Sequence, residues 1–132
     1  MELLEQINLT NGLTLNIFDL SRPIAADTVK VELSMQIKVV LEKAYFANNQ
    51  DYIDVKNVFG EELTFDHKTE RTIVSKKDEN TVREELLATF KNNLLKYLAS
   101  ENFSQMLALS VLRDIKNNPY KYQSHHQPET EE

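Results

Sequence analysis

Apolar and polar side chains alternate between residues 29 and 41 more regularly than anywhere else in the sequence. The apolar members are Val29, Val31, Leu33, Met35, Ile37, Val39 and Leu41. A period of two is typical of a strand with one buried face. A helical stripe through Val29, Leu33 and Ile37 is the rival interpretation, but the β-branched residues of the run favour a strand. We predict one long strand, with a bend or bulge near Val39-Val40, where the alternation breaks.

The preceding residues, 3–20, predict a β-hairpin around Asn11-Gly12. A two-residue turn would mix apolar and polar side chains on each face of the hairpin, whereas a three-residue loop makes both faces uniform. The opposed pairs are then Leu9 with Leu13, Ile7 with Leu15, Asn8 with Thr14, and Gln6 with Asn16. This register favours a type I turn with Gly12 in the left-handed conformation.

Shorter strands are predicted after the long one. Tyr52 to Phe59 carries apolar residues at alternate positions, and turn-forming residues precede it at 48–51. Residues 63–66 and 71–75 are predicted to form a short hairpin, with Phe65 and Ile73 as its apolar members.

Two helices are predicted from residue 80 onward. Thr81 and Glu84 have the spacing of a capping box, and an apolar stripe follows at helical spacing. The break at residues 99–102 offers Ser100 or Asn102 as the next cap, and Asn118-Pro119 ends the second helix. A short connection between amphipathic helices predicts an antiparallel helical hairpin.

These elements predict an α+β fold, because strands come first and helices last. We expect an antiparallel sheet of about five or six strands, open or barrel-like. A C-terminal helical hairpin follows the sheet. Residues 1–118 should form one domain, mainly β over 1–76 and two helices over 80–118. Residues 119–132 are predicted to be a largely disordered acidic tail.

Composition excludes several classes of function. The chain has 15 Lys and Arg residues against 21 Asp and Glu, a net charge of −6 that argues against nucleic-acid binding. The absence of cysteine excludes disulfides, thiolate metal sites and thiol nucleophiles. Gly12 and Gly60 are the only glycines, so no glycine-rich phosphate-binding loop can be written. The acidic start of the chain and the lack of a long apolar run predict a cytoplasmic protein without membrane contact.

His67 is the one histidine outside the tail, and Asp66 and Glu70 flank it. A histidine beside carboxylates can bind a metal or act as a general base. The simpler interpretation is a solvated charged segment, since a functional site needs convergent geometry. A small-molecule or metal site near His67, in a hydrolase or a binding domain, is therefore kept as the alternative function.

Tyr45, Phe46 and Tyr52 surround a polar segment and form a second candidate site. If exposed together, these aromatic side chains would suit a protein partner; otherwise they close one end of the core. With no catalytic constellation visible and no cofactor indicated, we expect a non-enzymatic interaction module. Its partner should be a second copy, forming a homodimer through a sheet face or edge, or another protein.

Overall fold

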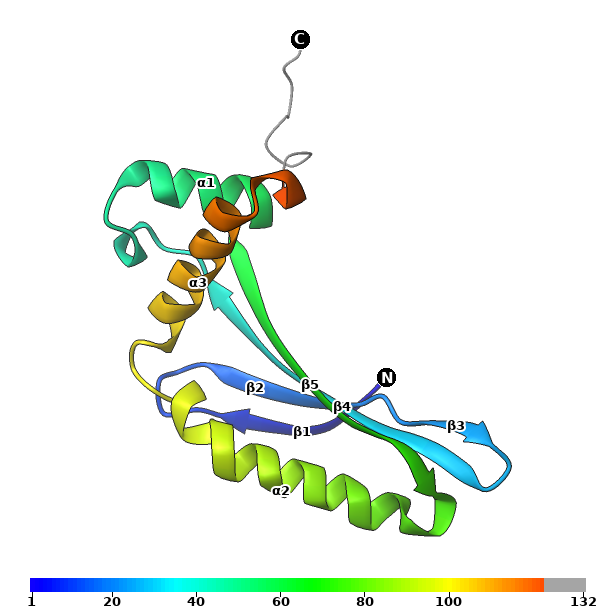
Figure 1. Ribbon diagram of the computed structural model, residues 1–132. Helices are drawn as coiled ribbons and strands as arrows, with labels where there is room; N and C mark the ends of the chain where they lie inside the picture. The colour runs from blue at the N-terminus through cyan, green and yellow to red at the C-terminus, as the bar shows by residue number, and fades with distance from the viewer. Residues whose placement is uncertain (123–132) are drawn as a thin grey trace. The chain divides into compact units, whose positions relative to one another are not determined.

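The computed structural model describes residues 1–122 and contains five strands and three α-helices within them (Figure 1). The strands are β1 (Glu2–Asn8), β2 (Thr14–Asp19), β3 (Arg22–Ala25), β4 (Thr28–Val40) and β5 (Glu62–Ser75). The helices are α1 (Asn49–Phe59), α2 (Glu79–Leu98) and α3 (Phe103–Asn117). The short 3-10 helices are η1 (Lys43–Tyr45), η2 (Lys76–Asp78) and η3 (Pro119–Tyr122). The predicted α+β class, with C-terminal helices after an antiparallel sheet, is confirmed.

The first hairpin has the predicted register. β1 and β2 pair Gln6 with Asn16, Ile7 with Leu15 and Asn8 with Thr14. The amide of Leu9 donates to the carbonyl of Leu13 at 2.8 Å, which closes the three-residue loop. Gly12 has φ +92°, the left-handed conformation that a side chain would disfavour. A register shift between Leu3 and Glu5 near the start of β1 was not predicted.

β4 is the central strand, as the alternating run predicted. β2 and β3 follow one another along one edge of β4, pairing Ile17 with Met35 and Arg22 with Lys30. β5 pairs with the opposite edge. The amide of Lys76 donates to the carbonyl of Asp27 at 2.9 Å, whereas Asp66 contacts Ser34, so β5 runs antiparallel to β4.

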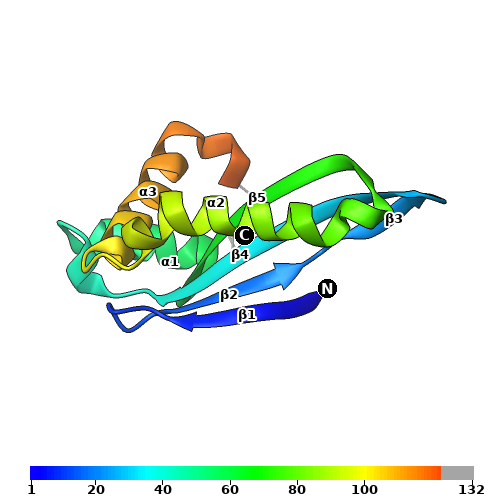
Figure 2. The same ribbon diagram turned by 90° about the horizontal axis from the view of Figure 1, so that it is seen from below.

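The strands with an outward edge are β1, β3 and β5. β1 and β5 lie on opposite sides in Figure 2. Over residues 1–122 the sheet is therefore open, and the barrel that the sequence left as an option does not form.

The chain divides into two compact units. The first consists of Met1–Ile37 and Thr64–Ser100, and the second of Lys38–Leu63 and the chain from Glu101 onward. Consequently, β4 and β5 each contribute residues to both units.

In the first unit, α2 covers one face of the sheet (Figures 1 and 2). The covered face carries the inward positions of the strands, which are almost completely buried: Leu15, Ile17, Val29, Val31, Leu33, Met35 and Ile37. On α2 the buried residues are Leu86, Phe90 and Leu98, at helical spacing. This apolar layer is the core of the first unit, and it explains why apolar and polar residues alternate from Val29 to Ile37.

Polar contacts hold α2 to the sheet along its length. Arg83 contacts Asp19 at 3.0 Å near the N-terminal end of the helix, and Lys91 contacts Glu5 at 3.0 Å farther along it. At the C-terminal end, the Asn11 amide donates to the carbonyls of Leu98 and Ser100 at 2.9 and 2.8 Å.

In the second unit, α1 packs against α3, and Lys116 of α3 pairs with Asp51 of α1 at 3.3 Å. The prediction of a strand over Tyr52 to Phe59 is wrong, because these residues are helical. Asn48 caps the helix by accepting the amide of Asp51 at 2.8 Å. A residue type read as turn-forming therefore begins a helix here, since Asn suits both positions.

The predicted hairpin of residues 63–66 and 71–75 is also wrong, because β5 is continuous from Glu62 to Ser75. The polar residues between those segments contain neither Gly nor Pro, and a sheet edge tolerates polar side chains on both faces. Leu63 is buried and the half-buried residues that follow it, Phe65, His67 and Thr69, are also odd-numbered, whereas the buried residue near the end of the strand, Val74, is even-numbered. One extra, bulged residue in the strand produces such a change of face.

The helix ends differ from the predictions in detail. α2 begins at Glu79 with Asp78 at its N-cap, so Thr81 and Glu84 do not form a capping box at its start. Asn102 is the N-cap residue of α3, as predicted, although its side chain makes no capping hydrogen bond. In the predicted tail, residues 119–122 form η3, where Tyr122 is buried and contacts Phe59 edge-on at 5.7 Å. The rest of that tail lies outside the described residues.

Candidate functional site

The candidate site lies on β5 in the first unit, where alternate side chains point to opposite faces of the sheet. The imidazole of His67 stacks on the ring of Phe90 in α2, with centroids 5.8 Å apart and planes at 28°. The neighbouring Asp66 points to the other face, where it accepts a hydrogen bond from Ser34 at 2.8 Å.

A groove of about 300 Å³ runs between β5 and α2 beside His67. It is lined by His67, Thr69, Leu86, Thr89, Phe90, Asn93 and Leu94. Leucine and phenylalanine side chains supply its apolar wall, and hydroxyl, amide and imidazole groups supply its polar atoms. This mixture suits an extended peptide or a small, mainly apolar molecule.

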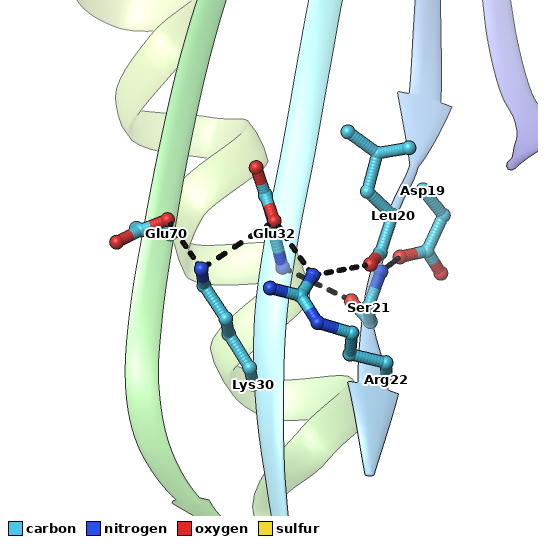
Figure 3. Close-up of polar contacts among 7 residues, drawn as sticks. All are labelled: Asp19, Leu20, Ser21, Arg22, Lys30, Glu32 and Glu70. Carbon is cyan, nitrogen blue, oxygen red and sulfur yellow. Dashed lines mark hydrogen bonds and ion pairs between the residues drawn. The ribbon is translucent and has the colours of Figure 1, made fainter. Parts of the chain in front are cut away.

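The opposite face of the sheet carries a chain of ion pairs, which Figure 3 shows between β3, β4 and β5. Arg22 contacts Glu32 at 3.0 Å, Lys30 contacts Glu32 at 3.7 Å, and Lys30 contacts Glu70 at 3.1 Å. The hydrogen bond from Arg22 lowers the pKa of the Glu32 carboxyl below its usual value, and the positive charge of Lys30 acts in the same direction. These pairs tie three strands together and leave their charges matched.

The backbone edge of β5 that faces away from β4 is the other part of the site. Within residues 1–122, β5 pairs with β4 alone, so one edge of a strand of 14 residues faces no other strand. Along this edge the charged side chains of one face alternate in sign at every second residue: Asp66, Lys68 and Glu70. An edge of this kind can accept a further strand.

The residues predicted around His67 are only partly brought together. Asp66 and Glu70 share a face of the sheet, where each has its own partner, and His67 lies on the other face. No group of three His, Cys, Asp or Glu side chains placed to hold a metal ion occurs in the described part of the chain.

The aromatic residues of the second candidate site lie in the second unit. Phe46 and Tyr52 are in contact, with ring centroids 6.2 Å apart, and Phe46 is only 9% exposed. Lys43 and Lys56 each lie 5.8 Å from the centre of the Tyr52 ring. The backbone carbonyl of Tyr45 accepts a hydrogen bond from Gln105 at 3.3 Å. This arrangement favours the role of closing one end of a core.

Sequence reasoning did not assign Lys68 and Thr69 to this site, where they lie on β5 beside its outward edge. The sequence signal that could have indicated this edge is the alternation of negative and positive charge at every second residue, in Asp66, Lys68 and Glu70. That period is the one expected of a strand.

Residues 38–114 match the model of the family described as the CPL (NUC119) domain. Because the match covers more than half of the chain, the protein belongs to this family. The matched region includes all of β5 and α2, and thus the groove between them.

No curated protein and no solved structure matches the chain. Within the part that the structure describes, none of the helices is both long enough and apolar enough to cross a membrane.

Proposed function

We propose that the protein is a non-enzymatic interaction module that self-associates through an edge of its sheet. The observation that carries this proposal is the outward edge of β5, a strand of 14 residues that lies beside a groove lined in part by apolar side chains. A second copy would extend the sheet by adding its own strand along this edge.

The outer strands of the sheet, β1, β3 and β5, differ in how well they suit this role. β3 has only four residues. β1 has seven residues and a register irregularity between Leu3 and Glu5. Short and irregular edges hinder the addition of a further strand. β5 is twice as long as β1, and its exposure alternates without a break from Glu62 to Glu70, ahead of the inferred bulge. The charges on this regular part alternate in sign, so opposite charges can face one another across an interface. These differences favour β5 as the associating edge.

The experiment is a measurement of mass in solution by light scattering over a wide range of protein concentration. We expect a mass approaching twice the 15.3 kDa of one chain as the concentration rises. A mass that stays at 15.3 kDa at every concentration would overturn the proposal.

A second candidate function is the binding of a small, mainly apolar molecule in the groove beside His67. It is supported by the stacking of His67 on Phe90 and by the volume of about 300 Å³. A thermal-shift screen with small aromatic and aliphatic carboxylates tests it, with His67→Ala as the variant. The candidate is abandoned if no compound raises the melting temperature, or if the variant responds like the unaltered protein.

A further inference from the structure

The charges on β5 discriminate between the ways in which two copies of the strand can pair. In a parallel arrangement in register, each of Asp66, Lys68 and Glu70 faces its own copy, and like charges directly opposite are destabilising. An antiparallel arrangement centred on Lys68 is equally unfavourable. It opposes Lys68 to itself and Asp66 to Glu70.

Two antiparallel registers bring opposite charges together. A pair centred on Thr69 places Lys68 opposite Glu70 twice, once on each side of the symmetry axis. A pair centred on His67 places Lys68 opposite Asp66 in the same way. Both registers keep α2 of each copy on the same face of the joined sheet, because the paired residues have the same parity.

Three observations favour the register centred on Thr69. Thr69 lies near the middle of β5, so both halves of the strand lie along the other copy, whereas centring on His67 leaves one end of the strand beyond it. Two threonines facing each other form a favourable cross-strand pair. The Glu70 side chain is 45% exposed, against 38% for Asp66, so it is the more accessible to a further cation, although it already contacts Lys30.

We propose that two copies of the chain join through antiparallel β5 strands centred on Thr69, with Lys68 of each copy paired to Glu70 of the other. This inference rests on the proposed self-association and specifies its interface. The two sheets would become one continuous sheet, and the two grooves beside α2 would lie next to each other across the symmetry axis.

Single-cysteine variants test the register directly, because the chain contains no cysteine of its own. In Thr69→Cys the two cysteine Cα atoms would lie about 4.5–5.5 Å apart across the strand pair. That distance is within the range of about 4.4–6.8 Å that a disulfide requires. We expect Thr69→Cys to form a disulfide-linked dimer under mild oxidation.

Two matched controls lie on the same strand. His67→Cys would place its two cysteines about 13 Å apart, and Thr64→Cys about 33 Å apart, so neither should cross-link. Cross-linking of His67→Cys in place of Thr69→Cys would overturn the Thr69 register while leaving self-association intact. A dimer in which none of the three variants cross-links would place the interface elsewhere. A mass that is monomeric throughout would remove the proposed function together with the register.

Charge variants give an independent readout of the same interface. Lys68→Glu and Glu70→Lys should each weaken the dimer about tenfold or more, because each places like charges opposite one another at two points. An equimolar mixture of the two variants should recover association as a heterodimer, since both contacts are then attractive. The proposed pairing is wrong if the mixture associates no better than either variant alone, provided that circular dichroism shows both to be folded.

Discussion

At the scale of single residues, Asn11 makes more structural connections than its place in a surface loop would indicate. Its side-chain amide donates to the carbonyls of Leu98 and Ser100, and its oxygen accepts the amide of Leu13 at 3.1 Å. Carbonyls at the C-terminal end of a helix have no partner within the helix. Asn11 therefore both shapes the loop and caps α2 from another segment of the chain.

Replacing Asn11 tests this double role. We expect Asn11→Ala to lower the free energy of unfolding by about 1–3 kcal/mol, because it removes three hydrogen bonds of a partly buried group. Asn11→Asp should be at least as destabilising. It keeps the acceptor but loses both donors and adds a negative charge at the negative end of the helix dipole.

Urea denaturation measures both changes, and Thr10→Ala in the same loop is the control. Thr10 makes only a 3.4 Å contact with the carbonyl of Ala99, so its loss should matter little. The interpretation fails if Asn11→Asp is as stable as the unaltered protein.

Glu32 is the residue for which a dependence on pH can be predicted. The hydrogen bond from Arg22 holds the pKa of Glu32 below its usual value of 4.5. A carboxyl with a lower pKa in the folded chain stabilises the fold above its unfolded pKa, and this contribution is lost as the pH falls through the folded value. The stabilisation should therefore be present above about pH 4.5 and disappear below it.

We expect the stability of Glu32→Gln to fall less steeply below pH 4.5 than that of the unaltered protein. Thermal unfolding followed over a series of pH values measures the slope. Glu84→Gln, which changes an exposed carboxyl on α2, is the control. Equal slopes for Glu32→Gln and the unaltered protein would contradict a linkage through this carboxyl.

At the scale of elements, the long strand and the first hairpin were predictable, and α1 and β5 were not. β4 and the β1–β2 pair have one buried face each, so apolar and polar residues alternate along these strands with a period of two. α1 contributes only Val55 as a fully buried side chain, and two alternating apolar residues were enough to imitate a strand. β5 is polar on both faces in its middle, where the hydrophobic pattern contains no signal.

Phe90 is the residue on which the attachment of α2 can be tested. It is 3% exposed and lies between the sheet and the helix, in contact with His67. We expect Phe90→Ala to lower the free energy of unfolding by about 3–5 kcal/mol, from lost apolar contact and the cavity left behind. Phe90→Leu keeps much of the volume and should cost clearly less. Equal losses in urea denaturation would show that filling this space is not what stabilises α2.

The candidate site could be predicted only in part for a related reason. His67 was recognisable as the one histidine outside the tail, and it does lie in the groove. The apolar residues around it, Leu86, Phe90 and Leu94, come from α2 and are brought there by packing. No sequence spacing links a strand residue to a helix that packs over it, whereas spacing does reveal contacts within one helix.

At the scale of the whole molecule, neither unit is built from one continuous stretch of chain. β4 and β5 begin in one unit and end in the other, so each unit depends on backbone that the other also uses. Cooperative opening units often coincide with supersecondary motifs, and the pair formed by β4 and β5 has residues in both units. We infer that a destabilising substitution in one unit lowers the stability of both units.

Val55→Ala tests this coupling, because Val55 is fully buried in the second unit. The substitution should cost about 2 kcal/mol from the cavity it leaves. Hydrogen exchange followed by mass spectrometry should show loss of protection in α2 as well as in α1 and α3. Val58→Ala, at a less buried position of the same helix, is the control. Loss of protection confined to α1 and α3 would show that the units open separately.

The discontinuous arrangement also has a consequence for synthesis on the ribosome. β4 is complete when Val40 has been added, but α2, which covers its apolar face, is finished only at Leu98. At about 5–20 residues per second, the growing chain carries that face uncovered for several seconds. During this interval Leu33, Met35 and Ile37, which are fully buried in the finished protein, have no helix over them. The nascent chain is thus most vulnerable to aggregation before its last helices have emerged.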